Sequence, residues 1–157
     1  MQYWLMKSEP DCYSVDDLKK DKKSLWTGVR NYQARNFMTQ QMAQGDGVLF
    51  YHSNAQPPGI AGLARVSSDG DIDDPTQFLK NDEHYDPKAT REKPIWGCVE
   101  VEWIETFQKY LSLEFLKGNP KLADLGVLKK GTRLSVLPVS EKDFKEICKM
   151  AGAKKAP

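Results

Sequence analysis

Apolar and polar residues alternate most regularly between residues 95 and 104, with Val99 and Val101 on one face and Glu100 and Glu102 on the other. This period of two predicts a half-buried strand. Other short apolar runs between turn residues predict further strands. The expected strands cover residues 2–7, 48–51, 60–66 and 133–139, and one more strand end leads into a helical turn over residues 111–116.

Three segments begin with residues that favour the start of a helix. Ser14 precedes a short helix that ends near the lysine-rich run at residues 20–23, which we expect to be a solvated loop. Asn31 is a good N-cap for a second helix running to about Gln44, because apolar residues follow it at spacings of three and four. Ser140 opens a terminal helix with a pattern that resembles a capping box.

The order of these elements defines the expected fold class. Strands and helices do not alternate regularly, and residues 67–94 form a long Asp- and Pro-containing stretch that we expect to be an irregular excursion. This order excludes a doubly wound sheet. It favours an α+β fold in which a bent, mixed or antiparallel sheet of five or six strands closes as a barrel with two to four helices at its sides. Loops as long as this excursion are usually functional or mobile.

The composition is that of a single domain. The chain has 157 residues, 39% of them hydrophobic, so we expect one domain over residues 1–157. No apolar run approaches the roughly 20 residues that cross a bilayer, and the N-terminus lacks the pattern of a secretory signal. Three scattered cysteines and two histidines argue against both a disulfide framework and a metal site. We therefore expect a cytoplasmic monomer that needs no metal and no cofactor.

The net charge of +1 is unevenly distributed along the chain. Residues 1–45 carry a surplus of two positive charges, residues 46–105 a surplus of seven negative charges, and residues 106–157 a surplus of six positive charges. A protein that binds nucleic acid through a broad electrostatic surface would be basic throughout. Any phosphate binding is therefore expected to be local and modest.

Sequence motifs for catalysis are missing. The chain has no phosphate-binding glycine loop and no Gly-x-Ser-x-Gly elbow. His52 and Ser53 are adjacent, but neighbours on a strand point to opposite faces and are poorly placed to exchange a proton. Cys98 is interpreted as a small buried apolar residue. Two alternatives stay open: an enzyme that uses His52 or Cys98 on a nucleotide or small metabolite, and a protein-interaction domain that uses residues 67–94.

Polar and aromatic residues gather instead at the expected ends of strands and helices. The segment from Trp26 to Arg35 combines an aromatic ring, guanidinium groups and amides, a set that suits a flat polar ligand such as a nucleobase. Trp26 as plain core and Asn31 as a mere cap are the alternatives. Three segments are expected to converge on one cavity, with Lys7, Ser8, Trp26, Val29, Arg30, Asn31, Tyr32, Arg35, Tyr51, His52, Ser53 and Asn54 as candidate ligand-binding residues.

Several sequence blocks also resemble a known family. The blocks Trp4–Pro10, Trp26–Phe37, Phe50–Asn54 and Pro58–Gly62 resemble the signature of the EVE domain, and Gln77-Phe78, His84–Pro87, Trp96 and Arg133–Val136 match its later pattern in the same order. The resemblance spans roughly residues 2–150 and involves several ungapped blocks in register.

This resemblance implies a PUA-like fold, which is a bent β-barrel flanked by helices. EVE domains are similar to YTH domains, which hold a methylated adenine of RNA in an aromatic cage, and are regarded as readers of modified bases, mainly modified cytosines in DNA. By that likeness Trp26 is expected to be a cage wall, Asn31 to contact the base edge, and Lys7 and Ser8 to form the rim. The candidates for an adjacent phosphate are Lys7, Arg30 and Arg35, and those for the other cage aromatics are Tyr32, Tyr51, Phe78, Tyr85 and Trp96. The expected function is non-catalytic binding of DNA or RNA through one modified base.

Overall fold

Six strands form one strongly curved sheet in the computed structural model, which describes residues 1–156. The strands of this sheet are β1 (Tyr3–Ser8), β2 (Lys23–Leu25), β3 (Gly47–His52), β4 (Gly59–Val66), β7 (Glu100–Ser112) and β8 (Val136–Val139). A small second sheet pairs β5 (Ile72–Asp73) with β6 (Gly97–Cys98). The α-helices are α1 (Val15–Asp21), α2 (Tyr32–Asn36), α3 (Leu113–Lys117) and α4 (Glu141–Ala151), and a π-helical turn (Phe37–Gln41) follows α2. Short 3₁₀ turns cover Pro75–Phe78, Pro120–Leu122 and Gly126–Leu128.

The sheet is mixed, and β1 lies inside it. The strand order is β2-β7-β4-β3-β1-β8, with β1 parallel to β3 and antiparallel to β8. In the parallel pair, Lys7 is opposite Tyr51 and Ser8 is opposite His52. Because parallel strands run in the same direction, β1 and β3 end at the same edge of the sheet. That edge is where the functional cavity described below is found.

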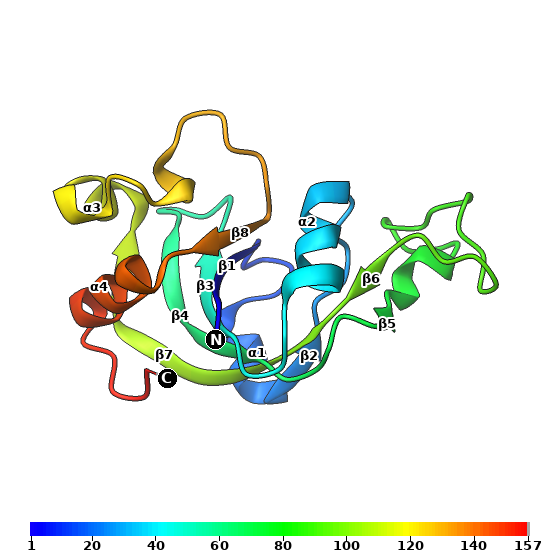
Figure 1. The fold of residues 1–157 in the computed structure, drawn as a ribbon, viewed down its shortest axis with the longest axis horizontal. Coiled ribbons are helices and arrows are strands. Elements are labelled where there is room, and N and C mark those ends of the chain that lie inside the picture. The colour runs from blue at the N-terminus through cyan, green and yellow to red at the C-terminus, as the bar shows by residue number, and fades with distance from the viewer. Residues whose placement is uncertain (157) are drawn as a thin grey trace.

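The expected fold class is confirmed, in the form of a half-barrel. Figure 1 shows β7 curving beneath the other strands, from the excursion at one end of the molecule to α3 at the other. Two register shifts between β4 and β7, at Ile60/Gly62 and Leu63/Ala64, mark the irregularities that bend this pair. The sheet stops at β2 and β8, which pair with each other nowhere in residues 1–156.

Both faces of the sheet are buried, and β1 shows how its side chains divide between them. Tyr3 and Leu5 belong to one apolar cluster, while Trp4 and Met6 belong to a second on the opposite face, as the alternation of a strand requires. α4 covers the first face, with the Phe144 ring centroid 4.3 Å from that of Tyr3. The buried side chains of α1 and α2 join the second cluster.

Three local predictions were wrong, one of them the strand expected at residues 133–139, which covers only Val136–Val139. The helix expected to run from Asn31 to about Gln44 is α-helical only to Asn36 and continues as the π-helical turn, where the amide of Met42 donates to the carbonyl of Phe37. The loop expected at residues 20–23 extends one residue too far in the prediction, because β2 already begins at Lys23, beside Glu102 of β7. At Lys23 a pairing with a strand that is distant in sequence decides the backbone conformation.

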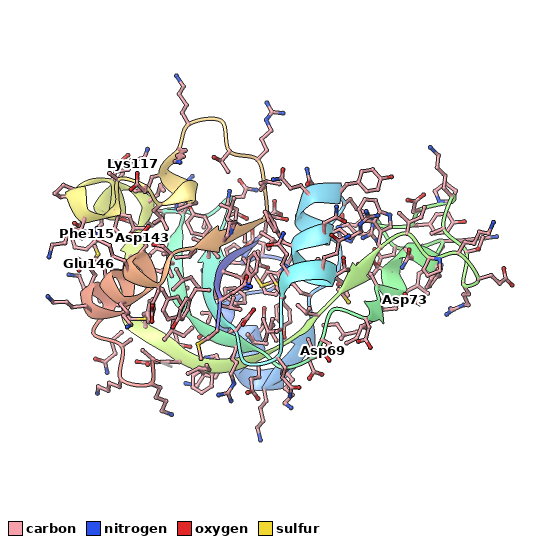
Figure 2. All side chains as sticks on the ribbon, in the orientation of Figure 1. Asp69, Asp73, Phe115, Lys117, Asp143 and Glu146 are labelled. Carbon is pink, nitrogen blue, oxygen red and sulfur yellow. The ribbon has the colours of Figure 1, made fainter. Side chains whose placement is uncertain are left out.

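The excursion, residues 67–94, is held in place by buried polar contacts despite its lack of periodicity. Gln77 is fully buried, its amide nitrogen donates to the carbonyls of Asp74 and Trp96, and its amide oxygen accepts from the amides of Ile95 and Trp96. In Figure 2 the labelled Asp73 lies at this end of the molecule, and Phe115 of α3 lies at the opposite end. The excursion therefore belongs to the α2 side of the sheet.

Candidate functional site

A cavity of about 950 Å³ opens where β1 and β3 end. We call it the Trp26 cavity. Its walls come from the end of β1, the segment after β2, the excursion, and the segment before β8. The lining residues used below are Lys7, Ser8, Glu9, Tyr13, Trp26, Gly28, Ser53, Thr76, Asp82, Glu83, His84 and Arg133.

Backbone hydrogen bonds bring the sequence-distant walls together. The amide of Lys7 donates to the carbonyl of Ser135 (2.8 Å), and the amide of Ser53 donates to the carbonyl of Ser8 (3.0 Å). The Ser8 hydroxyl donates to the carbonyl of Tyr13 (2.6 Å). Four of the twelve predicted residues, Lys7, Ser8, Trp26 and Ser53, thus line one cavity, as expected from their places at strand ends.

Trp26 is both core and cavity wall. The residue is 8% exposed and its ring packs edge-on against Phe50, with centroids 5.4 Å apart and an interplanar angle of 74°. The indole N–H groups of the other three tryptophans donate to Asp46, Asp86 and Thr106. The Trp26 N–H has no hydrogen-bond partner within residues 1–156, yet the structure describes no buried side-chain nitrogen without a partner. This donor is therefore accessible at the cavity surface.

Gly28 allows the excursion to approach Trp26. Gly28 has a positive φ of 84°, and its amide donates to the Asp74 carboxylate at 2.8 Å. The His84 imidazole lies directly over its α-carbon, where a β-carbon would come within 2.8 Å of Cε1. A side chain at this position would therefore be strained and would push His84 away.

Arg30 fixes the excursion against this segment. Its guanidinium donates to the Asp74 carboxylate (3.1 Å), to the Thr76 hydroxyl (2.9 Å), twice to the His84 carbonyl, and to the Val29 carbonyl. These five hydrogen bonds use all five N–H donors of the side chain. Arg30 was predicted as a phosphate contact, but in this structure no N–H remains for a phosphate. It positions the wall that carries Thr76 and His84.

Asp74 is the buried anion of this hydrogen-bond network, which we call the Arg30 network. The residue is 1% exposed, and burial alone would raise the pKa of its carboxyl group. Hydrogen bonds from Thr76, from the amide of Gly28 and from Arg30 outweigh that effect, so the pKa lies below its ordinary value. The carboxylate stays charged and holds the two segments together.

Both cations and carboxylates line the cavity, with Glu9 close to Lys7 after β1 and with Asp82 and Glu83 on the excursion. Burial lowers the pKa of Lys7, whose ammonium lies 5.9 Å from the centre of the Tyr51 ring. Neither Lys7 nor Arg133 forms an ion pair among the described residues. The excursion supplies Asp82 and Glu83, which lie 3.2 Å and 3.8 Å from the His84 ring nitrogens. Within residues 1–156 the cavity therefore offers two cations without an ion-pair partner and hydrogen-bond acceptors on more than one wall.

The aromatic candidates for a cage lie outside the Trp26 cavity. None of Tyr32, Tyr51, Phe78, Tyr85 and Trp96 is among its lining residues. The rings that do line it, besides Trp26, are Tyr13 and His84. The Tyr13 hydroxyl donates to Asp21 (2.7 Å), and burial together with this hydrogen bond raises its pKa to about 12. Tyr13 was missed because its only sequence signal was its place after the turn that ends the first strand.

Several other predicted residues have structural partners of their own. The Asn31 side chain caps α2 by accepting from the amide of Ala34 at 3.0 Å. Val29 and Tyr51 are buried in the two apolar clusters, and Asn54 takes a positive φ of 49° in the turn after β3. Tyr32 and Arg35 lie on α2 beside Trp96. These residues surround the cavity segments without lining the cavity.

The candidate catalytic residues have neither the geometry nor the ionisation of a nucleophile and base. Nε2 of His52 accepts from the amide of Val15 at 3.1 Å, and burial lowers the pKa of the imidazole despite the charge of Asp16. Cys98 is fully buried, and burial with the nearby Asp74 charge raises the pKa of its thiol to about 12. A thiol with this pKa is protonated at neutral pH and unreactive.

No group of three or more His, Cys, Asp or Glu side chains within residues 1–156 could hold a metal ion. Nor does this part of the chain contain a helix of the length and apolar character that crossing a membrane requires.

Comparison with known proteins identifies the family. Residues 2–150 match the EVE domain family. Thymocyte nuclear protein 1 of Rattus norvegicus is 40% identical over 160 residues, which covers 90% of this chain and 70% of the rat protein. The chain therefore belongs to the EVE domain family, and its half-barrel is a PUA-like fold.

Solved structures agree with this assignment. A hypothetical protein from Leishmania major superposes with a TM-score of 0.92 at 46% identity, covering 97% of this chain and 95% of that one. The human THYN1 protein, solved in complex with 5-methylcytosine-containing DNA, superposes with a TM-score of 0.87 at 36% identity, covering 100% of both chains.

Proposed function

We propose that this protein is a non-catalytic reader that binds DNA by taking one modified cytosine into the Trp26 cavity. The observation that carries the proposal is the accessible indole N–H of Trp26, the one tryptophan donor without a partner among residues 1–156. The human relative solved with 5-methylcytosine-containing DNA supports the ligand class. At about 950 Å³ the cavity has the size of a small-molecule site and accommodates a single base.

The polar groups of the cavity suit cytosine. The base presents an exocyclic amino group that donates to carboxylates, and Asp82 and Glu83 stand on the excursion wall. The carbonyl and ring-nitrogen acceptors of the base suit a donor such as the Trp26 N–H. The side-chain rings of Tyr13 and His84 supply further flat surfaces against which the base can lie. These groups read the base, while Lys7 and Arg133 contact the backbone.

Phosphate contacts are few in this proposal. Lys7 and Arg133 are the two free cations of the cavity, and such contacts position a strand without reading its sequence. Extruding a base from a duplex costs a few kcal/mol. A modified cytosine in a single strand or opposite a mismatch should therefore bind more tightly than one in a perfect duplex.

The test is a titration of short labelled oligonucleotides followed by fluorescence anisotropy. Each oligonucleotide carries one central cytosine, either 5-methylated or unmodified, in DNA and in RNA, as single strand and as duplex. We expect tighter binding of the methylated DNA, and a larger difference in the single strand. Preference for methylated RNA over methylated DNA would reassign the polymer and overturn this proposal.

Two tryptophan variants provide the internal comparison. Trp26→Phe should reduce affinity for the strand that carries the methylated base. Trp103→Phe should not, because the Trp103 N–H already donates to Thr106 (2.9 Å) and the residue lies outside the cavity. Equal affinities for methylated and unmodified strands in the wild-type protein would refute the function.

We also propose that the protein acts as a monomer in the cytoplasm. One chain supplies every wall of the cavity, which supports a monomer. Cys12, Cys98 and Cys148 are all free in the described structure, which is consistent with a reducing compartment.

A further inference from the structure

A second aromatic surface lies on α2, outside the Trp26 cavity. Tyr32 is 60% exposed, an unusual position for a large aromatic residue. Its ring stacks on Trp96, with centroids 5.0 Å apart and an interplanar angle of 17°. Trp96 is buried and is anchored by its indole N–H, which donates to Asp86 at 2.8 Å. The exposed ring therefore rests on a fixed support.

The outer face of Tyr32 is open. Arg35 is the cation nearest this ring, and its Cζ lies 4.7 Å from the Tyr32 centroid and 5.7 Å from that of Trp96. Tyr32 stays 60% exposed although Trp96 stacks on one face of its ring, so its accessible surface lies on the side away from Trp96. The guanidinium is itself held by the Asn36 side chain and the carbonyl of Ile95. The result is a rigid ring with one free face and a positive edge.

A chain of contacts joins this ring to the Trp26 cavity. Thr76 lines the cavity and accepts from Arg30 at 2.9 Å. The Arg30 Cζ lies 5.1 Å from the Trp96 centroid, and Trp96 supports Tyr32. The Arg30 network thus holds both the wall of the cavity and Trp96, the ring on which Tyr32 stacks. The two surfaces are therefore fixed relative to one another.

We propose that Tyr32 is a second stacking platform, which takes the base of a nucleotide next to the modified one. The proposal rests on the function proposed above, because the first base must occupy the Trp26 cavity. A free aromatic face beside a guanidinium group is the arrangement on which bases of any sequence stack. The Trp26 cavity would hold the modified base, whereas Tyr32 would add affinity without sequence preference.

The test compares two single-stranded oligonucleotides, each with one central 5-methylcytosine. In the first the flanking positions carry natural bases, and in the second they are abasic. Tyr32→Ala should weaken binding of the first about five-fold or more and leave binding of the second unchanged. Tyr32→Phe is the matched control and should behave as wild type, because the Tyr32 hydroxyl makes no hydrogen bond within residues 1–156.

Each other outcome overturns the proposal. Unchanged binding of both strands by Tyr32→Ala would mean that the open ring serves another partner. Equally weakened binding of both strands would mean that Tyr32 acts only through the fold. If Tyr32→Ala unfolds the helix, Tyr32→Leu takes its place in the same comparison, because leucine keeps apolar bulk on Trp96. Failure of the base reader itself is separate, since wild-type protein would then bind methylated and unmodified strands equally.

Discussion

The His84 imidazole lies against the α-carbon of Gly28, so closely that a β-carbon there would meet three ring atoms at 2.8–3.0 Å. This contact joins the Trp26 segment to the excursion at the mouth of the cavity. It also explains why the block Trp26–Phe37 contains a glycine where the chain has a positive φ. The shape of the cavity depends on the absence of a single methyl group.

Gly28→Ala should therefore lower the unfolding free energy more than an ordinary substitution of glycine does. We expect a loss of about 1–2 kcal/mol in unfolding free energy from the positive φ alone, and a further loss from displacement of His84. Gly131→Ala is the matched control, because Gly131 has a φ of 83° with no atom within 4 Å of an added β-carbon. Urea unfolding measures both. An equal loss of stability in the two variants would show that the His84 contact is unimportant. If the contact matters, the additional change His84→Ala should restore part of the stability that Gly28→Ala loses.

Arg30→Ala should lower the unfolding free energy by about 3 kcal/mol, because Asp74 would keep a buried charge without its cation. It should also weaken DNA binding, since the excursion wall would lose its anchor. Arg65→Ala, which removes an exposed ion pair with Glu102, should cost less than about 1 kcal/mol. Thermal and urea unfolding compare the two. A similar loss of unfolding free energy in both variants would contradict the central role of the Arg30 network.

Trp26→Phe should reduce affinity for the modified base about two- to ten-fold, the value of one hydrogen bond. The phenyl ring retains packing against Phe50, so the fold should be kept. Trp26→Ala is a poorer probe, because truncating this largely buried ring should cost about 3–5 kcal/mol of stability. Anisotropy titration of the Phe variant gives the answer. Unchanged affinity would show that the indole N–H does not contact the ligand.

Protonation of His52 should destabilise the fold at mildly acidic pH. Burial lowers the pKa of His52 in the folded state, so the unfolded chain binds the proton more readily. Its contribution to stability is thus fully present above the unfolded pKa of about 6.5 and is lost as the pH falls below that value. His52→Gln can still accept from Val15 and should flatten the difference in unfolding free energy between pH 7.5 and pH 5. An unchanged difference would assign that pH dependence to other groups.

Arg133→Gln should weaken binding of methylated and unmodified strands by the same factor. A phosphate contact carries no base preference, and its loss should reduce the slope of log affinity against log salt by about 0.7–0.9. Lys130→Gln, an exposed change in the same segment but outside the cavity lining, is the control. Titrations at several salt concentrations give both slopes. A selective loss for methylated strands would instead place Arg133 against the base.

Short-range features of the structure were predictable from the sequence. Ser14 forms a full capping box with Asp17, and Asn31 caps α2, both from residues three positions apart. The regular alternation near Val99 and Val101 identified the longest strand. In each case the partners that decide the conformation are close in the chain or share one period.

The contacts that define the site were not predictable in the same way. Arg30 was assigned to a phosphate, but its acceptors Asp74 and His84 lie 44 and 54 positions away. No local pattern shows that these acceptors use every donor of the guanidinium. Arg133 was within a recognised block, yet it is brought to the cavity only because Ser135 accepts from Lys7. Sequence placed the ends of β1 and β3 within one residue and could not show which side chains turn inward.

The position of β1 between β3 and β8 has a consequence for synthesis of the chain. β1 is paired on one side by residues near 50 and on the other only by Val136–Val139, which are synthesised much later. Until those last strand residues emerge, β1 has an unpaired apolar edge that can associate with other nascent chains. The Lys7–Ser135 bond that closes the cavity also forms at this final step. Ligand binding should thus require synthesis of the chain through Val139, the same point at which the edge of β1 becomes paired.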